Sequence, residues 1–281
     1  MSAFVETNGI KLHYVAHPGD GPAVVLVHGL TANCRAFDVV AGHLAPRLRV
    51  IAPDMRGRGA SDKPDAGYAM GDHAADVLGL LDALGLERVV MGGHSFGGLL
   101  SLYMAARHPE RVERVLMLDA AISAASERTR ELIRPALARL ERDYPSFEAY
   151  LDLLREAPYY HGWTWDPAVE GYYAADVATA ENGRVRPRAR PAQIAAAADG
   201  VIAEPWREHL ARVACPVLMV HADGPYGPPG APPIVSRAQA EETRALLADC
   251  VYVHVPGNHM TMLYGEGARA TADAILAFVA P

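Results

Sequence analysis

The sequence predicts an α/β protein with an eight-stranded, mostly parallel sheet that carries helices on both faces. Two observations predict this fold. Short apolar runs alternate with helical patterns along the chain, and six of the runs are almost continuously apolar, which is typical of strands buried on both faces of a parallel sheet. A third observation adds an insertion: after the sixth strand the alternation stops, and helical patterns follow one another over residues 122–208.

The strands can be placed from their apolar runs and their turn residues. Asn8-Gly9 separates the first two runs, and this dipeptide is a strong hairpin signal, so the sheet should begin with an antiparallel pair. The predicted strands cover residues 3–7, 10–15, 23–28, 49–52, 89–92, 115–118, 217–221 and 251–255. Helical periodicity fills the gaps between them at residues 35–46, 71–84, 96–107, 236–248 and 267–279.

The interruption predicts two parts of the chain. Residues 1–121 and 209–281 form the core domain, and residues 122–208 form a helical cap inserted after strand six. Helical patterns occur there at residues 126–144, 147–156 and 191–201, with no strand between them. Aromatic residues crowd the middle of the cap, where they fit the packing of the cap and the lining of a substrate pocket equally well: Tyr159, Tyr160, Trp163, Trp165, Tyr172 and Tyr173.

Composition narrows the functional class. The chain has 281 residues with 26 basic and 33 acidic side chains, a net charge of −7, which argues against nucleic acid or an anionic membrane as partner. The start of the chain lacks the pattern of a signal peptide, and no apolar segment approaches the length of a membrane span. Cys34, Cys215 and Cys250 have no CxxC spacing and are typical of buried thiols. We therefore expect a cytoplasmic protein with a small-molecule substrate; the oligomeric state stays open.

Gly93-His94-Ser95-Phe96-Gly97 is the most informative motif in the sequence. It follows the strand at residues 89–92 and precedes a helical pattern, which is the context that a GxSxG nucleophile elbow requires. A sharp strand-to-helix turn strains the backbone of the central serine and tolerates only small residues two positions to either side. Ser95 is thus predicted to project its hydroxyl above the sheet as a nucleophile.

Two backbone N–H groups are predicted to form an oxyanion hole beside Ser95. The first belongs to Phe96, directly after the nucleophile, and the second to Leu30, in the His28-Gly29-Leu30 turn after the third strand. An oxyanion hole needs two such donors aimed at the point where negative charge develops. His28 itself is interpreted as a structural brace of that turn.

His259 is the predicted general base, because it lies in the loop after the last strand and can reach across the carboxyl edge of the sheet to Ser95. The acid of a Ser-His-Asp triad has two candidates. Asp119 directly follows strand six, and Asp223 follows strand seven. Asp119 is favoured, since it ends a buried strand, whereas Asp223 opens a loop and can be explained as a turn residue.

With these motifs in place, the chain resembles the α/β-hydrolase superfamily of serine hydrolases. The resemblance rests on His28-Gly29, the DMRGRGAS segment at residues 54–61, Gly93–Gly97 and Gly257-Asn258-His259. The segment at residues 61–68 and the spacing from Ser95 to Asp119 are similar, more narrowly, to the (acetamidomethylene)succinate hydrolases.

The resemblance implies a carboxylesterase-like enzyme that cleaves a small ester through an acyl-enzyme, without a metal or an organic cofactor. The same triad also serves hydrolysis of an amide, a vinylogous C–N bond or a C–C bond, so these reactions stay open. Epoxide hydrolysis and dehalogenation are disfavoured, because those branches carry aspartate where this chain has Ser95. A third reading, from another class, is a non-catalytic receptor that binds a small ligand on the same fold.

Overall fold

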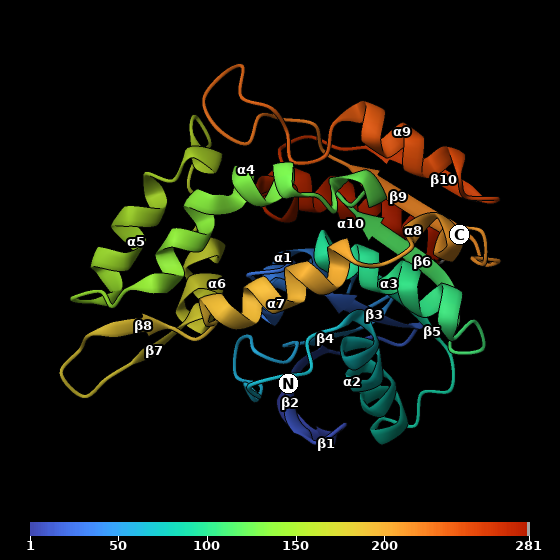
Figure 1. The fold of residues 1–281 in the computed structure, drawn as a ribbon, viewed down its shortest axis with the longest axis horizontal. Coiled ribbons are helices and arrows are strands. Elements are labelled where there is room, and N and C mark those ends of the chain that lie inside the picture. The colour runs from blue at the N-terminus through green and yellow to red at the C-terminus, as the bar shows by residue number, and fades with distance from the viewer. Residues whose placement is uncertain (280–281) are drawn as a thin grey trace.

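The computed structural model describes residues 1–279, without the side chains of residues 135 and 136, so residues 280 and 281 of the predicted core range lie outside it. Its main sheet has eight strands in the order β1-β2-β4-β3-β5-β6-β9-β10 (Figure 1). The β1–β2 and β2–β4 pairs are antiparallel, and all other pairs in this sheet are parallel. The predicted α/β fold class is confirmed.

The strands of this sheet correspond to the eight apolar runs. They are β1 (Ser2–Thr7), β2 (Ile10–His17), β3 (Ala23–Val27), β4 (Arg49–Pro53), β5 (Val89–His94), β6 (Val112–Leu118), β9 (Val217–His221) and β10 (Cys250–His254). The helices outside the insertion are η1 (Cys34–Phe37), α1 (Asp38–Leu44), α2 (Met70–Ala83), α3 (Phe96–Arg107), α9 (Arg237–Ala245), η5 (Thr261–Leu263) and α10 (Gly265–Val279).

Helices cover both faces of the sheet, because the central strands are apolar on both sides. On β3, Val24 and Leu26 pack in one hydrophobic cluster with α1 and α10. Val25 and Val27 point the other way and pack in a second cluster with α2 and α3. The two clusters form the core of the molecule and hold the carboxyl ends of β3, β5 and β6 at one edge of the sheet.

The edge strand β10 differs from the expectation of a strand buried on both faces. None of its five residues is fully buried, and Val251 is 47% exposed. The reason is its place in the sheet: β10 pairs only with β9 and ends the sheet on that side. An apolar run alone does not distinguish an edge strand from a central one.

The insertion lies between two neighbouring strands of the sheet, β6 and β9. Over residues 122–208 it contains η2 (Ile122–Ala124), α4 (Glu127–Ala138), η3 (Arg139–Glu141), α5 (Phe147–Arg155), η4 (Pro158–Tyr160), α6 (Ala168–Asp176) and α7 (Pro191–Ile202). Helix α8 (Trp206–Leu210) begins within this range and ends two residues after it. We refer to residues 122–208 as the inserted segment. Its division from the core as a separate cap domain stays a prediction.

Two features of the inserted segment were absent from the sequence prediction. Strands β7 (Val177–Thr179) and β8 (Val185–Pro187) form an antiparallel hairpin, which projects at the left of Figure 1. The expectation of helices alone was therefore wrong here. Asn182-Gly183 makes the turn, with Gly183 at φ +80°, a conformation that glycine adopts without strain. Helix α6 was also missed, because its tyrosines have only moderate helix propensity.

No helix within residues 1–279 is long and apolar enough to cross a membrane. The cytoplasmic location stays a prediction from the sequence.

Candidate active site

Ser95 occupies a strained turn between β5 and α3. Its backbone has φ +54° and ψ −114°, outside the regions that ordinary residues favour. The flanking glycines are required by close contact with β3: a Cβ atom at Gly93 or Gly97 would lie 2.4 Å or 1.9 Å from the carbonyl oxygen of Val27. These distances are far shorter than van der Waals contact, so the elbow geometry depends on glycine at both positions.

Asp119 and His259 meet at the same edge of the sheet. Asp119 directly follows β6, and His259 lies in the loop after β10. The Nδ1–H of His259 donates to Oδ2 of Asp119 at 2.6 Å, and the backbone N–H of Ala222 donates to Oδ1 at 3.2 Å. Because Nδ1 carries the proton, the Nε2 lone pair of His259 is free to accept a proton.

Asp223, the alternative acid, lies elsewhere. Its Oδ1 accepts a hydrogen bond from Nε2 of His254 at 2.7 Å, and both side chains are about half exposed. The carboxylate of Asp119, by contrast, is fully buried. The structure thus brings His259 together with Asp119 and pairs Asp223 with a different histidine.

Burial shifts the pKa values of the Asp119–His259 pair in opposite directions. Burial lowers the pKa of His259 to about 3, because the charged imidazolium loses its hydration. Burial raises the pKa of Asp119 to about 6, against the nearby imidazoles of His221 and His94, which lower it. At neutral pH the pair is therefore a carboxylate beside a neutral imidazole.

Ser95 and His259 line the same two cavities, although their side chains make no hydrogen bond to each other in this structure. The larger cavity has a volume of about 290 Å³, and its walls are mainly aliphatic side chains of α4, α7 and the core, among them Ile133, Ile194 and Ile234. The smaller cavity has a volume of about 60 Å³ and is lined by tyrosines and by Arg139. The inserted segment contributes walls to both cavities.

The predicted oxyanion donors lie beside Ser95. Leu30 and Phe96 both line the larger cavity together with Ser95. The N–H of Phe96 is the first of helix α3 and has no acceptor within the helix. The N–H of Leu30 has no hydrogen-bond partner among the described residues. Both groups are therefore available to an incoming acceptor.

His28 fits the structural role that the sequence indicates. Its Nδ1–H donates to the carbonyl oxygen of Gly29 at 2.7 Å, and its Nε2 accepts from the backbone N–H of Met55 at 3.0 Å. Burial lowers the pKa of His28 to about 4, so it is neutral at pH 7. Both ring nitrogens are thus engaged in holding the Leu30 turn against the loop after β4.

Sequence reasoning missed His221, the last residue of β9. Its Nε2 lies 3.9 Å from Oδ1 of Asp119 and donates to the carbonyl oxygen of Val235 at 2.9 Å, while Tyr252 Oη bonds Nδ1 at 2.7 Å. The imidazole thus lies beside the carboxylate of Asp119. The sequence offered only a weak signal for a role of His221, namely its position at the end of a predicted strand. Because the residue belongs to an apolar run, it was interpreted as an ordinary strand residue.

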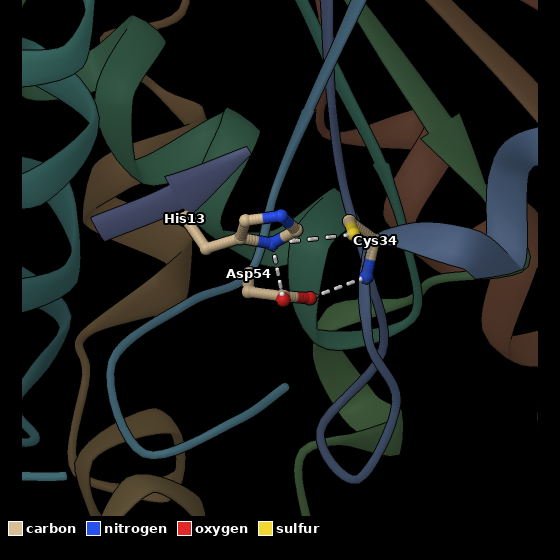
Figure 2. A group of neighbouring side chains, drawn as sticks. All are labelled: His13, Cys34 and Asp54. Atoms are coloured by element: carbon tan, nitrogen blue, oxygen red, sulfur yellow. Dashed lines mark hydrogen bonds and ion pairs between the residues drawn. The ribbon is translucent and has the colours of Figure 1, made fainter. Parts of the chain in front are cut away.

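His13, Cys34 and Asp54 form a buried cluster whose composition would suit a metal ion (Figure 2). Their hydrogen bonds already use the ligand atoms: Asp54 accepts from Nδ1 of His13 and from the backbone N–H of Cys34, each at 2.7 Å. Burial next to Asp54 raises the pKa of the Cys34 thiol strongly, which disfavours the thiolate that a metal needs. The cluster therefore fits a hydrogen-bonded brace between β2, η1 and the loop after β4.

Comparison with known proteins identifies the family of this chain. Residues 22–265 match the family described as alpha/beta hydrolase fold, and the chain belongs to this family of hydrolases. The 2-(acetamidomethylene)succinate hydrolase of Mesorhizobium japonicum is 32% identical over an alignment of 271 residues, and the match covers 92% of this chain and 87% of that protein. This similarity confirms both the superfamily and the narrower resemblance that the sequence motifs indicate.

Two further similarities agree with this assignment. A crystal structure of E-2-(acetamidomethylene)succinate hydrolase superposes with a TM-score of 0.81 at 26% identity and covers 100% of this chain and 99% of that chain. The 2-hydroxy-6-oxo-2,4-heptadienoate hydrolase of Pseudomonas putida is 43% identical over 124 residues, 43% of each protein. All three names describe hydrolases, and none describes an esterase.

Proposed function

We propose that this protein is a serine hydrolase that cleaves a small carboxylic ester, with Ser95 as nucleophile, His259 as general base and Asp119 as the acid that orients it. The observation that carries the proposal is the 2.6 Å hydrogen bond between His259 and Asp119 at the edge of the sheet where Ser95 stands on its strained turn. Nucleophile, base and orienting group on neighbouring strand ends are the arrangement that covalent acyl transfer requires.

The proposed reaction has two halves. In the first, His259 Nε2 takes the proton of the Ser95 hydroxyl while Oγ attacks the carbonyl carbon, and the N–H groups of Leu30 and Phe96 stabilise the oxyanion. The tetrahedral intermediate collapses, the C–O bond to the alcohol breaks, and imidazolium gives its proton to the leaving oxygen. In the second half, His259 deprotonates water, whose oxygen attacks the acyl-enzyme. The imidazolium then returns its proton to Oγ of Ser95 as the acyl bond to Oγ breaks and the acid leaves.

The larger cavity supports an apolar acyl group. Its aliphatic walls reach Ser95, and its volume of about 290 Å³ is roughly twice the ~150 Å³ of an engineered cavity that binds benzene. An acyl chain of about six to ten carbons is compatible with this space. We further propose that the inserted segment acts as a cap, because α4 and α7 provide walls of this cavity.

A second candidate is hydrolysis of a C–N bond, as the name of the Mesorhizobium japonicum relative favours. The same Ser95 attack and the same proton transfers would serve it, with nitrogen as the leaving atom. The non-catalytic receptor is a weaker alternative, since the described site offers unpaired N–H donors where an oxyanion would form.

A substrate panel separates these functions. We expect kcat/KM for p-nitrophenyl esters to rise from acetate to about octanoate, by a few-fold per methylene, because each buried methylene contributes about 0.8 kcal/mol. Ser95→Ala should lower the ester rate by about 10⁴-fold without loss of folding. Faster turnover of 2-(acetamidomethylene)succinate than of every ester would favour the C–N reaction. One slow turnover with retained product would instead indicate a receptor.

The two carboxylates give a second prediction. Asp119→Asn removes the acceptor for Nδ1–H of His259 and so loses both tautomer control and stabilisation of the imidazolium, with an expected drop in kcat of about 10⁴-fold. Asp223→Asn is the matched control and should keep most of the rate, because Asp223 bonds His254. The measurement is kcat on one ester for both variants. The reverse ranking would assign the acid to the loop after β9.

The pKa shifts predict the acid limb of the pH profile. As the pH falls, the first proton taken up by the Asp119–His259 pair inactivates it. A proton on His259 removes the lone pair that accepts the serine proton, and a proton on Asp119 removes the carboxylate that orients the imidazole. With the pKa of Asp119 raised to about 6 and that of His259 lowered to about 3, kcat/KM should be full at pH 7 and fall at about pH 6 or below. Circular dichroism at each pH monitors folding. A limb centred above pH 7 would contradict the assignment.

A further inference from the structure

Arg58 is a fully buried arginine that has no carboxylate partner among the described residues. Its Nε–H donates to the carbonyl oxygen of Leu30 at 3.0 Å, and Nη1 donates to the carbonyl oxygen of Arg56 at 2.7 Å. Its Nη2 is buried without a hydrogen-bond partner. The other buried arginines differ: Arg56 and Arg139 form ion pairs with Asp76 and Asp176.

The charge of Arg58 is therefore not neutralised locally. Burial lowers its pKa to about 10, which still leaves the guanidinium protonated at neutral pH. Asp76, the acidic side chain that acts on it, is held by two hydrogen bonds from Arg56. A buried cation without a counterion reduces stability, so its presence points to a role other than stability.

The position of Arg58 suggests what that role is. Leu30 follows β3 and Phe96 follows β5, so the two proposed oxyanion donors come from different parts of the chain. Arg58, in the loop after β4, touches both: it bonds the carbonyl of Leu30 and lies over the ring of Phe96, 5.4 Å from its centroid. Phe96 also packs edge-to-face with His73, which burial and the neighbouring arginines keep neutral by lowering its pKa.

We propose that Arg58 is a positioning residue of the oxyanion hole. Its hydrogen bond to the carbonyl oxygen of Leu30 and its contact with the ring of Phe96 hold the two residues whose N–H groups are the proposed donors. Its unneutralised positive charge therefore accompanies the two residues that would hold the oxyanion. A fixed charge in a site of low dielectric stabilises such an anion without reorganisation at the moment of reaction. Arg58 lines neither cavity, so it acts through Leu30 and Phe96 rather than on the substrate. The inference rests on the proposed serine hydrolase function.

Three substitutions test the proposal: Arg58→Met, Arg58→Gln and Arg58→Lys. Removing an oxyanion donor outright costs about 10²- to 10³-fold in kcat. Because both N–H groups remain here, we expect Met and Gln to lower kcat by about 10- to 100-fold, with KM changed less than threefold. Lysine keeps the charge and should recover at least part of the loss. Active sites are counted by complete reaction with a fluorophosphonate, so kcat refers to folded enzyme alone.

Arg111→Met is the matched control. Arg111 also donates to backbone carbonyls, those of Glu87 and Leu86, and in addition pairs with Asp82. It precedes β6 at the opposite edge of the sheet, so this variant should keep the parental kcat. A second readout is the affinity of phenylboronic acid, which adds to the Ser95 oxygen as a tetrahedral anion. It should weaken in Arg58→Gln in parallel with kcat/KM and stay unchanged in Arg111→Met.

The outcomes are distinguishable. A kcat within threefold of the parent in folded Arg58→Met or Arg58→Gln would overturn the proposal, as would equal losses in the Lys and Gln variants. If Arg58→Met does not fold, the comparison of Gln with Lys decides. Failure of the proposed function itself would be seen earlier, as a parent protein that does not hydrolyse esters or a Ser95→Ala variant that still does.

Discussion

The close contact between the Ser95 turn and the carbonyl oxygen of Val27 is the constraint on which the rest of the site depends. With side chains absent at Gly93 and Gly97, β5 can bend sharply into α3 while still packing against β3. This contact strains Ser95 and sets the first N–H of α3 beside it. Since β3 runs directly into the Leu30 turn, one packing contact places Ser95 and both proposed oxyanion donors in a common frame.

The electrostatics of the site depend on two buried charged side chains, Asp119 and Arg58, neither of which forms an ion pair with an oppositely charged Lys, Arg, Asp or Glu side chain among the described residues. The carboxylate of Asp119 accepts hydrogen bonds from the backbone N–H of Ala222 and from His259, and the imidazole of His221 lies 3.9 Å away. These polar contacts replace the water that a buried carboxylate loses. Arg58 is buried against Leu30 and Phe96, the residues of the proposed oxyanion donors, and has no carboxylate partner among the described residues. A negative group beside the proposed base and a positive group beside the proposed oxyanion donors have the polarity that acyl transfer requires. Burying both charges should reduce stability, a trade-off common at functional sites.

Much of this could be predicted from the sequence because it depends on local patterns. The apolar runs predicted all eight strands of the sheet, and the GxSxG motif predicted the turn at Ser95, since glycine spacing and secondary structure are both local. The rest depends on contacts between distant segments. His221 lies in a predicted strand and Arg58 in a predicted turn, so the sequence indicated only a structural role for each. The fold shows His221 beside Asp119 and Arg58 beside Leu30. The β7–β8 hairpin was hidden within an insertion interpreted as helical.

The central claim, attack by Ser95 to give an acyl-enzyme, is tested most directly by rapid acid quench of a p-nitrophenyl octanoate reaction followed by mass spectrometry. The account predicts a burst of one nitrophenol per active site and an octanoyl group on the peptide that carries Ser95. Ester turnover with an octanoyl group on another residue, or with the same turnover in Ser95→Ala, would contradict it.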